Sequence, residues 1–161
     1  MTVHKLILDD VFEEVECTLI GIHCTIEDYR LAYLLNKHLG ISLSRKSLDL
    51  DFNERKCAFS IFDWEDTKQL ETWSLVSNVF KTEVYQSGNQ SSLFDTQQSI
   101  IKTTYLIPEQ KAVNYFLKIN NTFNLNKEKQ ILNNIIKIPL VATAFSIDIN
   151  QLKSKDNLIF S

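Results

Sequence analysis

Residues 15–40 read VECTLIGIHCTIEDYRLAYLLNKHLG, and in this stretch a strand-like run leads directly into a helical one. Residues 15–24 are dense in apolar and β-branched side chains, which is typical of a strand. The helix that follows has a candidate N-cap in Thr25 and ends at Gly40, which can adopt the left-handed backbone conformation. Because its apolar residues occupy more than one side, we expect the helix to be packed over most of its circumference.

A second group of elements is expected in the last third of the chain. Two strand-like runs, IKTTYLI at 101–107 and VNYFLKI at 113–119, flank a corner at Pro108. Proline fixes φ near −65° and has no N–H to donate, so it suits the end of a strand and the first corner of a turn. The residues therefore predict two strands joined by a tight connection.

A second helix should follow these strands. It is expected to begin near Asn124 or Asn126 and to end before Pro139, with its apolar residues on one face. The next run, VATAFSIDI at 141–149, is again strand-like. The terminal NLIF, residues 157–160, is apolar enough that we expect it to dock on the rest of the chain.

The middle of the chain has the pattern of further strands. Residues 41–52 alternate apolar and polar side chains, which predicts a half-exposed strand with a bulge near Arg45 and Lys46, where the alternation breaks. The runs 57–64 and 72–80 are typical of a hairpin with a polar connection. Residues 86–99, rich in Ser, Gln and Asn with one Gly, predict a mobile loop.

The order of these elements predicts an α+β fold. Strand, helix and strand occur early and again late, with a hairpin between them. We expect a mainly antiparallel sheet with two principal helices on one face, in a ferredoxin-like or split β-α-β arrangement with extra strands. A closed or strongly bent antiparallel sheet that grips the helices is the alternative.

Length and composition favour one globular domain over residues 1–161. A chain of 161 residues that is 44% hydrophobic can bury its own core. Its three cysteines form no C-x-x-C pair, which favours a reducing compartment. The N-terminus lacks the layout of a secretion signal, and no apolar run approaches the length of a membrane span. We expect a cytoplasmic protein that does not enter the membrane.

The readable signatures of catalysis and cofactor binding are missing from the sequence. Cys17, His23 and Cys24 do not have the spacing of a zinc site, and adjacent strand residues point to opposite faces. The chain has no G-x-S-x-G motif, and its three glycines are isolated, unlike those of phosphate-binding loops. An isoelectric point near 5.6 argues against nucleic-acid binding. We expect no catalytic residue, metal or cofactor.

The corner carries a resemblance to a known family. Ile107-Pro108-Glu109 followed by Val113-Asn114-Tyr115 resembles the IPExxVDY motif, with three residues in place of the motif's two between Glu109 and Val113, and DYRLAYLLNKHLG, WSLVSN and LKSKDNLIF are also similar to that family. The family consists of small bacterial proteins without an established activity, so the resemblance implies a bacterial source but no reaction. Where the family motif has Asp, this chain has Asn114, which cannot exchange a proton near neutral pH.

Two hypotheses of function follow. The first is a small non-catalytic protein that binds another protein or a second copy of itself, as a homodimer. The second is a small-molecule-binding protein or an enzyme with a cleft near Arg30, Tyr105 and Glu109, in which Glu109 is the acid or base. The candidate binding residues are therefore Arg30, Tyr105, Glu109 and Asn114. A structural role for Glu109, bonding to backbone N–H groups or to Arg30, and for Asn114 is the other interpretation.

Overall fold

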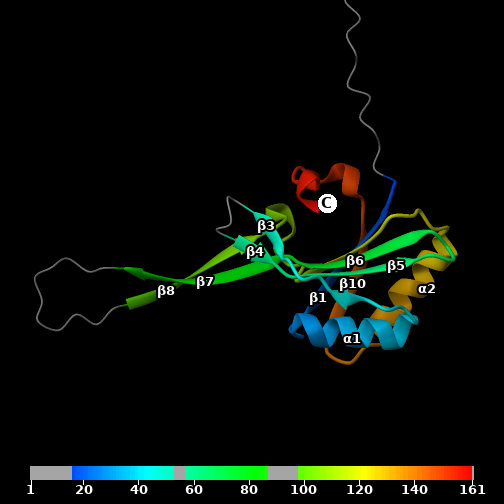
Figure 1. Ribbon diagram of the computed structural model, residues 1–161, viewed down its shortest axis with the longest axis horizontal. Coiled ribbons are helices and arrows are strands. Elements are labelled where there is room, and N and C mark those ends of the chain that lie inside the picture. The colour runs from blue at the N-terminus through cyan, green and yellow to red at the C-terminus, as the bar shows by residue number, and fades with distance from the viewer. Residues whose placement is uncertain (1–15, 53–56, 87–97, 161) are drawn as a thin grey trace, which may run out of the picture.

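The computed structural model describes residues 16–52, 57–86 and 98–160 (Figure 1). Its elements follow the order β1 (Thr18–Cys24), α1 (Asp28–Leu39), β2 (Ser44–Arg45), β3 (Leu50–Phe52), β4 (Cys57–Phe59), β5 (Ile61–Asp66), β6 (Glu71–Ser77), β7 (Val79–Gln86), β8 (Gln98–Tyr105), η1 (Pro108–Gln110), β9 (Tyr115–Ile119), α2 (Leu125–Ile136), β10 (Val141–Ile147), η2 (Ile149–Gln151) and η3 (Lys155–Leu158).

The central sheet has the strand order β10-β1-β9-β6-β5-β2, and every neighbouring pair is antiparallel. Strands β9 and β10, which α2 connects, lie on either side of β1. In the same way β1 and β6, with α1 between them in the chain, lie on either side of β9. This is the split β-α-β arrangement, with β5 and β2 added at one edge. The predicted fold class is confirmed, and the sheet is open and not closed.

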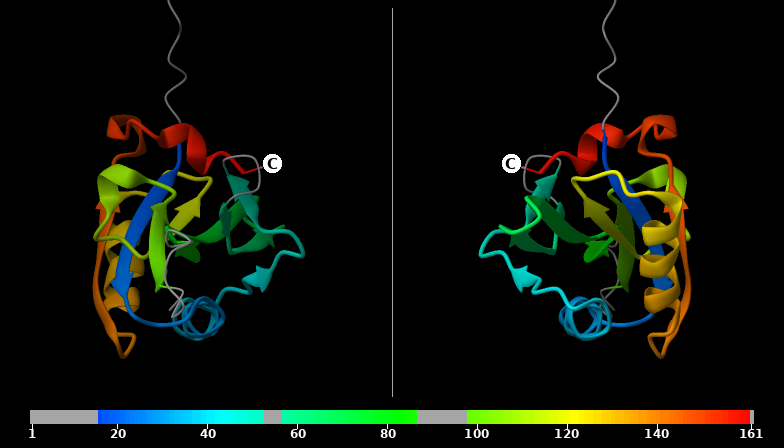
Figure 2. Two further views of the ribbon diagram at one scale, coloured as in Figure 1. Left: turned by 90° about the vertical axis from the view of Figure 1, so that its left-hand side faces the viewer. Right: turned by 90° about the vertical axis from the view of Figure 1, so that its right-hand side faces the viewer.

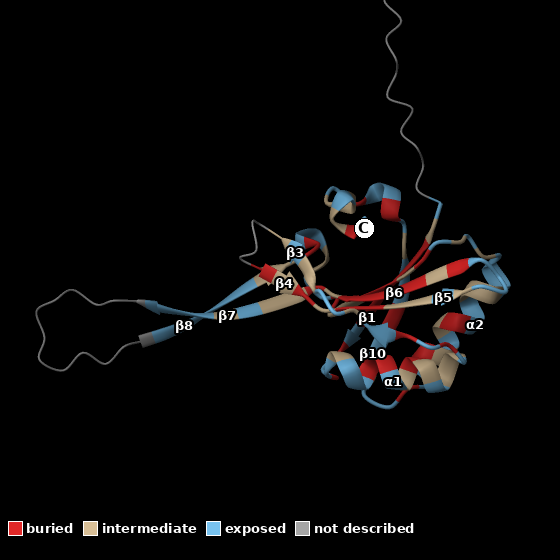
Figure 3. Ribbon diagram, viewed as in Figure 1, coloured by how far each residue is buried: buried red, intermediate tan, exposed pale blue. Residues whose placement is uncertain are grey.

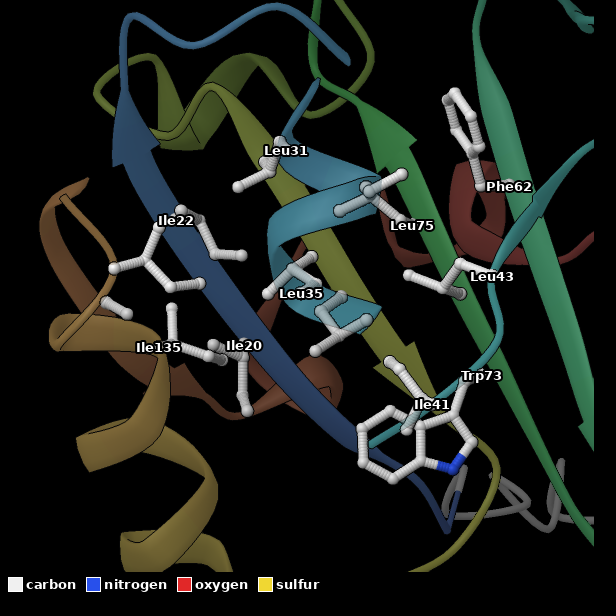
Figure 4. Close-up of a cluster of buried hydrophobic side chains, with 14 of the residues drawn as sticks. Ile20, Ile22, Leu31, Leu35, Ile41, Leu43, Phe62, Trp73, Leu75 and Ile135 are labelled. Carbon is white, nitrogen blue, oxygen red and sulfur yellow. The ribbon is translucent and has the colours of Figure 1, made fainter. Parts of the chain in front are cut away.

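Both helices cover one face of this sheet. Leu31 and Leu35 of α1 and Ile135 of α2 pack with Ile20 and Ile22 of β1 in one buried cluster (Figure 4). Helix α1 ends where predicted, and helix α2 begins where predicted. Gly40 ends α1 with φ 66°, and the side chain of Asn124 caps α2 by accepting from the N–H of Lys127.

The opposite face of the sheet is covered by the C-terminal segment, residues 148–160, and by the small β3–β4 hairpin. In both views of Figure 2 this segment, in red, and α1, in blue, lie on opposite sides of the molecule. Leu152 and Leu158 are buried with Leu19 and Phe116 of the sheet. Figure 3 shows buried residues, in red, both in the C-terminal segment and in the sheet. The docking predicted for the last residues is therefore confirmed.

Strands β7 and β8 pair only with each other in the described part of the chain and extend away from the body as a long hairpin (Figure 1). We call this hairpin, residues 79–86 and 98–105, the arm. The loop predicted over 86–99 falls almost entirely outside the described residues, and its ends belong to the two strands.

Three details of the predicted elements are wrong. Thr25 is not the N-cap of α1, because Ile26 is buried in the core and the chain stays extended through Glu27, the observed N-cap. Residues 41–52 do not form one strand, because β2 and β3 belong to different sheets. The predicted hairpin exists as β5–β6, whereas β4 pairs with β3. Neither helix in the described residues is long and apolar enough to cross a membrane.

Candidate functional site

The corner, residues 106–114, joins the arm to β9. Leu106 and Ile107 are completely buried, whereas Pro108 is exposed at the start of the short helix η1. Ile107 has φ −119° and ψ 92°, the extended conformation expected before proline. The structural interpretation of Pro108 as the beginning of a tight turn is confirmed.

Asn78 holds the corner in place through its side chain. It lies between β6 and β7 and has no exposed surface. Its Nδ2 donates to the carbonyl oxygens of Gln110 and Val113, at 2.9 and 2.8 Å, and its Oδ1 accepts from the N–H of Ile107 at 2.8 Å. These bonds satisfy three backbone groups of a turn that has no regular ladder of its own.

The backbone of Asn78 makes two further bonds to the same segment. Its N–H donates to the carbonyl of Asn114, and its carbonyl accepts from the N–H of Leu106, each at a distance of 2.9 Å. The arm leaves the body at this point, where Val79 pairs with Tyr105. The corner and Asn78 together therefore anchor the base of the arm to the central sheet.

Glu109 faces its own fold. Its Oε1 accepts from the N–H of Ser154 at 2.7 Å and its Oε2 from the Ser154 hydroxyl at 3.0 Å. Partial desolvation acts to raise the pKa of Glu109, but the bonds from the N–H and hydroxyl of Ser154, together with the backbone N–H groups of Glu109 and Lys153, outweigh it and keep the pKa below the ordinary value. Glu109 thus fastens the C-terminal segment to the corner, as the interpretation of bonds to backbone N–H groups anticipated.

Asn114 also makes structural hydrogen bonds. Its Oδ1 accepts from the N–H of Cys24 at 3.1 Å and from Nδ1 of His23 at 2.8 Å, at the end of β1. On a strand over the predicted range 113–119, Val113 and Tyr115 would share a face, and this expectation is wrong. Val113 packs in the cluster beneath the C-terminal segment and Tyr115 against the helical cluster, because β9 begins only at Tyr115.

The four candidate binding residues do not form one site. Arg30 is exposed on α1, on the opposite side of the sheet from Glu109. Tyr105 ends β8, with the Lys111 ammonium 5.9 Å from its ring centroid. A cavity of about 370 Å³ borders Glu109 and is lined mainly by β10 and residues 148–153, without Arg30, Tyr105 or Asn114. The expected cleft is not assembled around these residues.

Beyond its first pair, Val79 and Tyr105, the arm presents a face on which the described side chains are exposed. We call it the outer face, and it consists of Lys81, Glu83 and Tyr85 of β7 and Ser99, Ile101 and Thr103 of β8. Tyr85 is 62% and Ile101 63% exposed. On the other face Val84 and Ile100, a cross-strand pair, are 44% and 47% exposed. Single exposed apolar residues are common, but four on one projecting hairpin indicate a contact surface.

Sequence reasoning missed both Asn78 and the arm. The one available signal for Asn78 was its place in the run TWSLVSNVF, where a short polar residue interrupts apolar ones. Val84, Ile100 and Ile101 have the residue types of a core strand, so their pattern alone does not distinguish an exposed strand from a buried one.

The cysteines and acids do not assemble a metal site in the described residues. No group of three or more His, Cys, Asp or Glu side chains there is close enough to hold an ion. Cys24 is buried, and this burial raises the pKa of its thiol, which keeps it protonated near neutral pH.

The chain was compared with protein-family models, with curated proteins and with solved structures, and none of them matches.

Proposed function

We propose that this protein acts by association and that its arm binds a second copy of the same chain. The observation that carries the proposal is the outer face of the arm, whose apolar and charged side chains are exposed together on a hairpin held rigidly at its base by Asn78. A strand pair with two open edges and exposed apolar residues is a ready template for another chain.

The charges of the outer face favour a second copy as the partner. Lys81 and Glu83 are two residues apart on β7 and point to the same side. When two such faces pack about a two-fold axis, Lys81 of one copy can lie against Glu83 of the other, and the reverse pair forms as well. Tyr85 and Ile101 then provide the apolar part of the contact.

The size of the arm makes the expected association weak. Eight residues per strand at about 3.4 Å each give a face about 27 Å long and about 10 Å wide. Packing two such faces buries about 540 Å² in total, well below the 1,200–2,000 Å² or so of stable complexes. We therefore expect a transient, concentration-dependent dimer.

Sedimentation velocity from about 10 µM to about 1 mM tests this proposal. The wild-type chain should associate as its concentration rises, and a Tyr85→Ser/Ile101→Ser variant should stay monomeric. Thr143→Lys, on the uncharged edge strand β10, is the matched control because it adds a charge to an exposed strand outside the arm. A wild-type chain that stays monomeric, or association that is lost only in the β10 variant, would refute the arm as the interface.

A charge exchange identifies the second copy itself. Lys81→Glu alone should weaken association because carboxylates then face each other, and Glu83→Lys alone should do the same with ammonium groups. The double exchange, Lys81→Glu/Glu83→Lys, should restore it because the face is again self-complementary. Failure of the double exchange to recover any association would contradict the two-fold packing of the outer faces.

A further inference from the structure

Three neighbouring strands change from apolar to polar at matching positions on the face that the C-terminal segment covers. In register across β5, β6 and β9, the apolar row is Ile61, Val76 and Phe116. Two residues along each strand, the next row on the same face is Asp63, Ser74 and Lys118. Since a covered sheet face is ordinarily apolar, a polar row that crosses three strands together indicates a different use of that region.

This polar row borders a cavity of about 240 Å³. Thr72 of β6 and Asn120, which follows β9, continue the polar surface, and Lys46 and Phe160 complete the lining. Asn120 Oδ1 accepts a hydrogen bond from the N–H of Thr72, which leaves the Asn120 Nδ2 group as a donor. The cavity thus brings together two ammonium groups, two hydroxyls and an amide.

The charges in the cavity do not cancel. Lys46 pairs with Oδ2 of Asp63 at 3.0 Å, which neutralises the one carboxylate in the lining. Oδ1 of Asp63 is buried without a hydrogen-bond partner. Lys118 donates to the carbonyl of Leu158 at 2.7 Å and lies 5.1 Å from the Phe160 ring centroid. It takes part in no ion pair among the described residues.

Lys118 is therefore a half-buried cation without a counter-charge. Burial lowers the pKa of its ammonium group, because the charged form loses hydration that neighbouring groups only partly replace. An anion in the cavity would supply the missing charge. Ser74 lies directly across the strand pair from Lys118, at a separation of about 5 Å between their Cβ atoms, so both can reach one small group.

We propose that the cavity binds a small oxyanion, a carboxylate or phosphate group, with Lys118 Nζ as the charged donor. The hydroxyls of Ser74 and Thr72 and the Asn120 amide supply neutral hydrogen bonds from the floor of the cavity. This site lies on the body of the protein, uses no residue of the arm and does not depend on association of the chain.

NMR of the lysine ε-CH₂ groups tests the proposal, with sodium acetate and sodium phosphate as probes and sodium chloride at equal ionic strength as the reference. The Lys118 resonance should shift saturably with at least one oxyanion, and its titration midpoint should rise. If only acetate shifts the Lys118 resonance saturably, the ligand is a carboxylate. If only phosphate does so, the ligand is a phosphate group. No saturable shift with either probe would overturn the site.

Variants connect the signal to the cavity. Ser74→Ala and Lys118→Met should each weaken binding, Lys118→Met about tenfold or more because a charged hydrogen bond is lost. Lys111→Met, an exposed lysine outside the cavity, should leave binding unchanged. If Lys118→Met disturbs folding because the bond to Leu158 is lost, the wild-type Lys118 resonance and the Ser74→Ala variant still test whether the cavity binds the oxyanion. Equal affinity in Ser74→Ala, Lys118→Met and wild-type chains would refute the assignment.

Discussion

The side-chain oxygen of Asn78 accepts a hydrogen bond from the backbone N–H of Ile107 at a distance of 2.8 Å, and both residues are completely buried. Twenty-nine positions separate them in the sequence. This bond joins the strand that becomes the arm to the corner through which the chain returns to the sheet, and it acts together with two backbone hydrogen bonds of Asn78 to the same segment.

Replacing Asn78 by Ala should therefore destabilise the fold strongly. The change leaves the N–H of Ile107 and the carbonyl of Val113 without partners, at about 1–3 kcal/mol for each buried group, whereas the Gln110 carbonyl keeps its bond from the N–H of Val113. We expect the free energy of unfolding in urea to fall by about 3 kcal/mol or more. Asn133→Ala, at an exposed position on α2, is the control and should change little. A loss below about 1 kcal/mol for Asn78→Ala would show that the clamp is dispensable.

The bond between Glu109 and Ser154 should make the C-terminal segment sensitive to acid. Because the pKa of Glu109 is lowered in the folded state, its contribution is present above the unfolded-state pKa and is lost as the pH falls through the folded-state pKa. The Ser154 amide resonance should therefore titrate with a midpoint below 4.5, the ordinary value for glutamate. In Glu109→Gln this titration should vanish. A midpoint at or above 4.5 would contradict the bond.

Leu158 and Ile159 provide a matched pair for the docking of the same segment. Leu158 has no exposed surface, whereas Ile159 is 65% exposed. Leu158→Ala should lower the free energy of unfolding by about 2–5 kcal/mol, because it leaves a cavity under the segment. Ile159→Ala should cost less than about 0.5 kcal/mol. Similar losses for the two variants would mean that the segment is not specifically seated.

Gly21 tests how tightly the corner packs on β1. A Cβ at this position would lie 2.8 Å from Cδ1 of Ile147 and 2.9 Å from Cγ2 of Val113. Gly21→Ala should therefore destabilise by about 1–3 kcal/mol, chiefly because the buried, β-branched Val113 has little room to move. The loss of stability in the double variant Gly21→Ala/Val113→Ala should be smaller than the sum of the losses in the two single variants. Strict additivity would contradict direct contact.

Much of the fold was predictable because its determinants are local. The left-handed Gly40, the Asn124 cap and the extended residue before Pro108 each follow from the conformational preferences of one or two residues. The start of α1 was not predictable in this way. Thr25 has the right chemistry for a cap, but the burial of neighbouring Ile26 overrides it.

The candidate site was less accessible to sequence reasoning. Glu109 was singled out as a residue that could bond to backbone N–H groups, and Asn114 as one that could make structural hydrogen bonds. Their partners, Ser154 and Cys24, lie 45 and 90 positions away and could not be identified. Arg30 was grouped with Glu109 because their charges are opposite, yet the sheet separates them. Opposite charge carries no information about which face of the sheet each residue occupies.

Periodicity and capping preferences determined the helices, most strands and the α+β class, because these depend on interactions between residues only a few positions apart. Tertiary structure alone decided that β7 and β8 leave the body as an arm, that Asn78 anchors it and that a polar row on three strands meets in one cavity. A strand with exposed apolar residues has the same alternation as a buried one. Only long-range pairing determines whether a neighbour covers it.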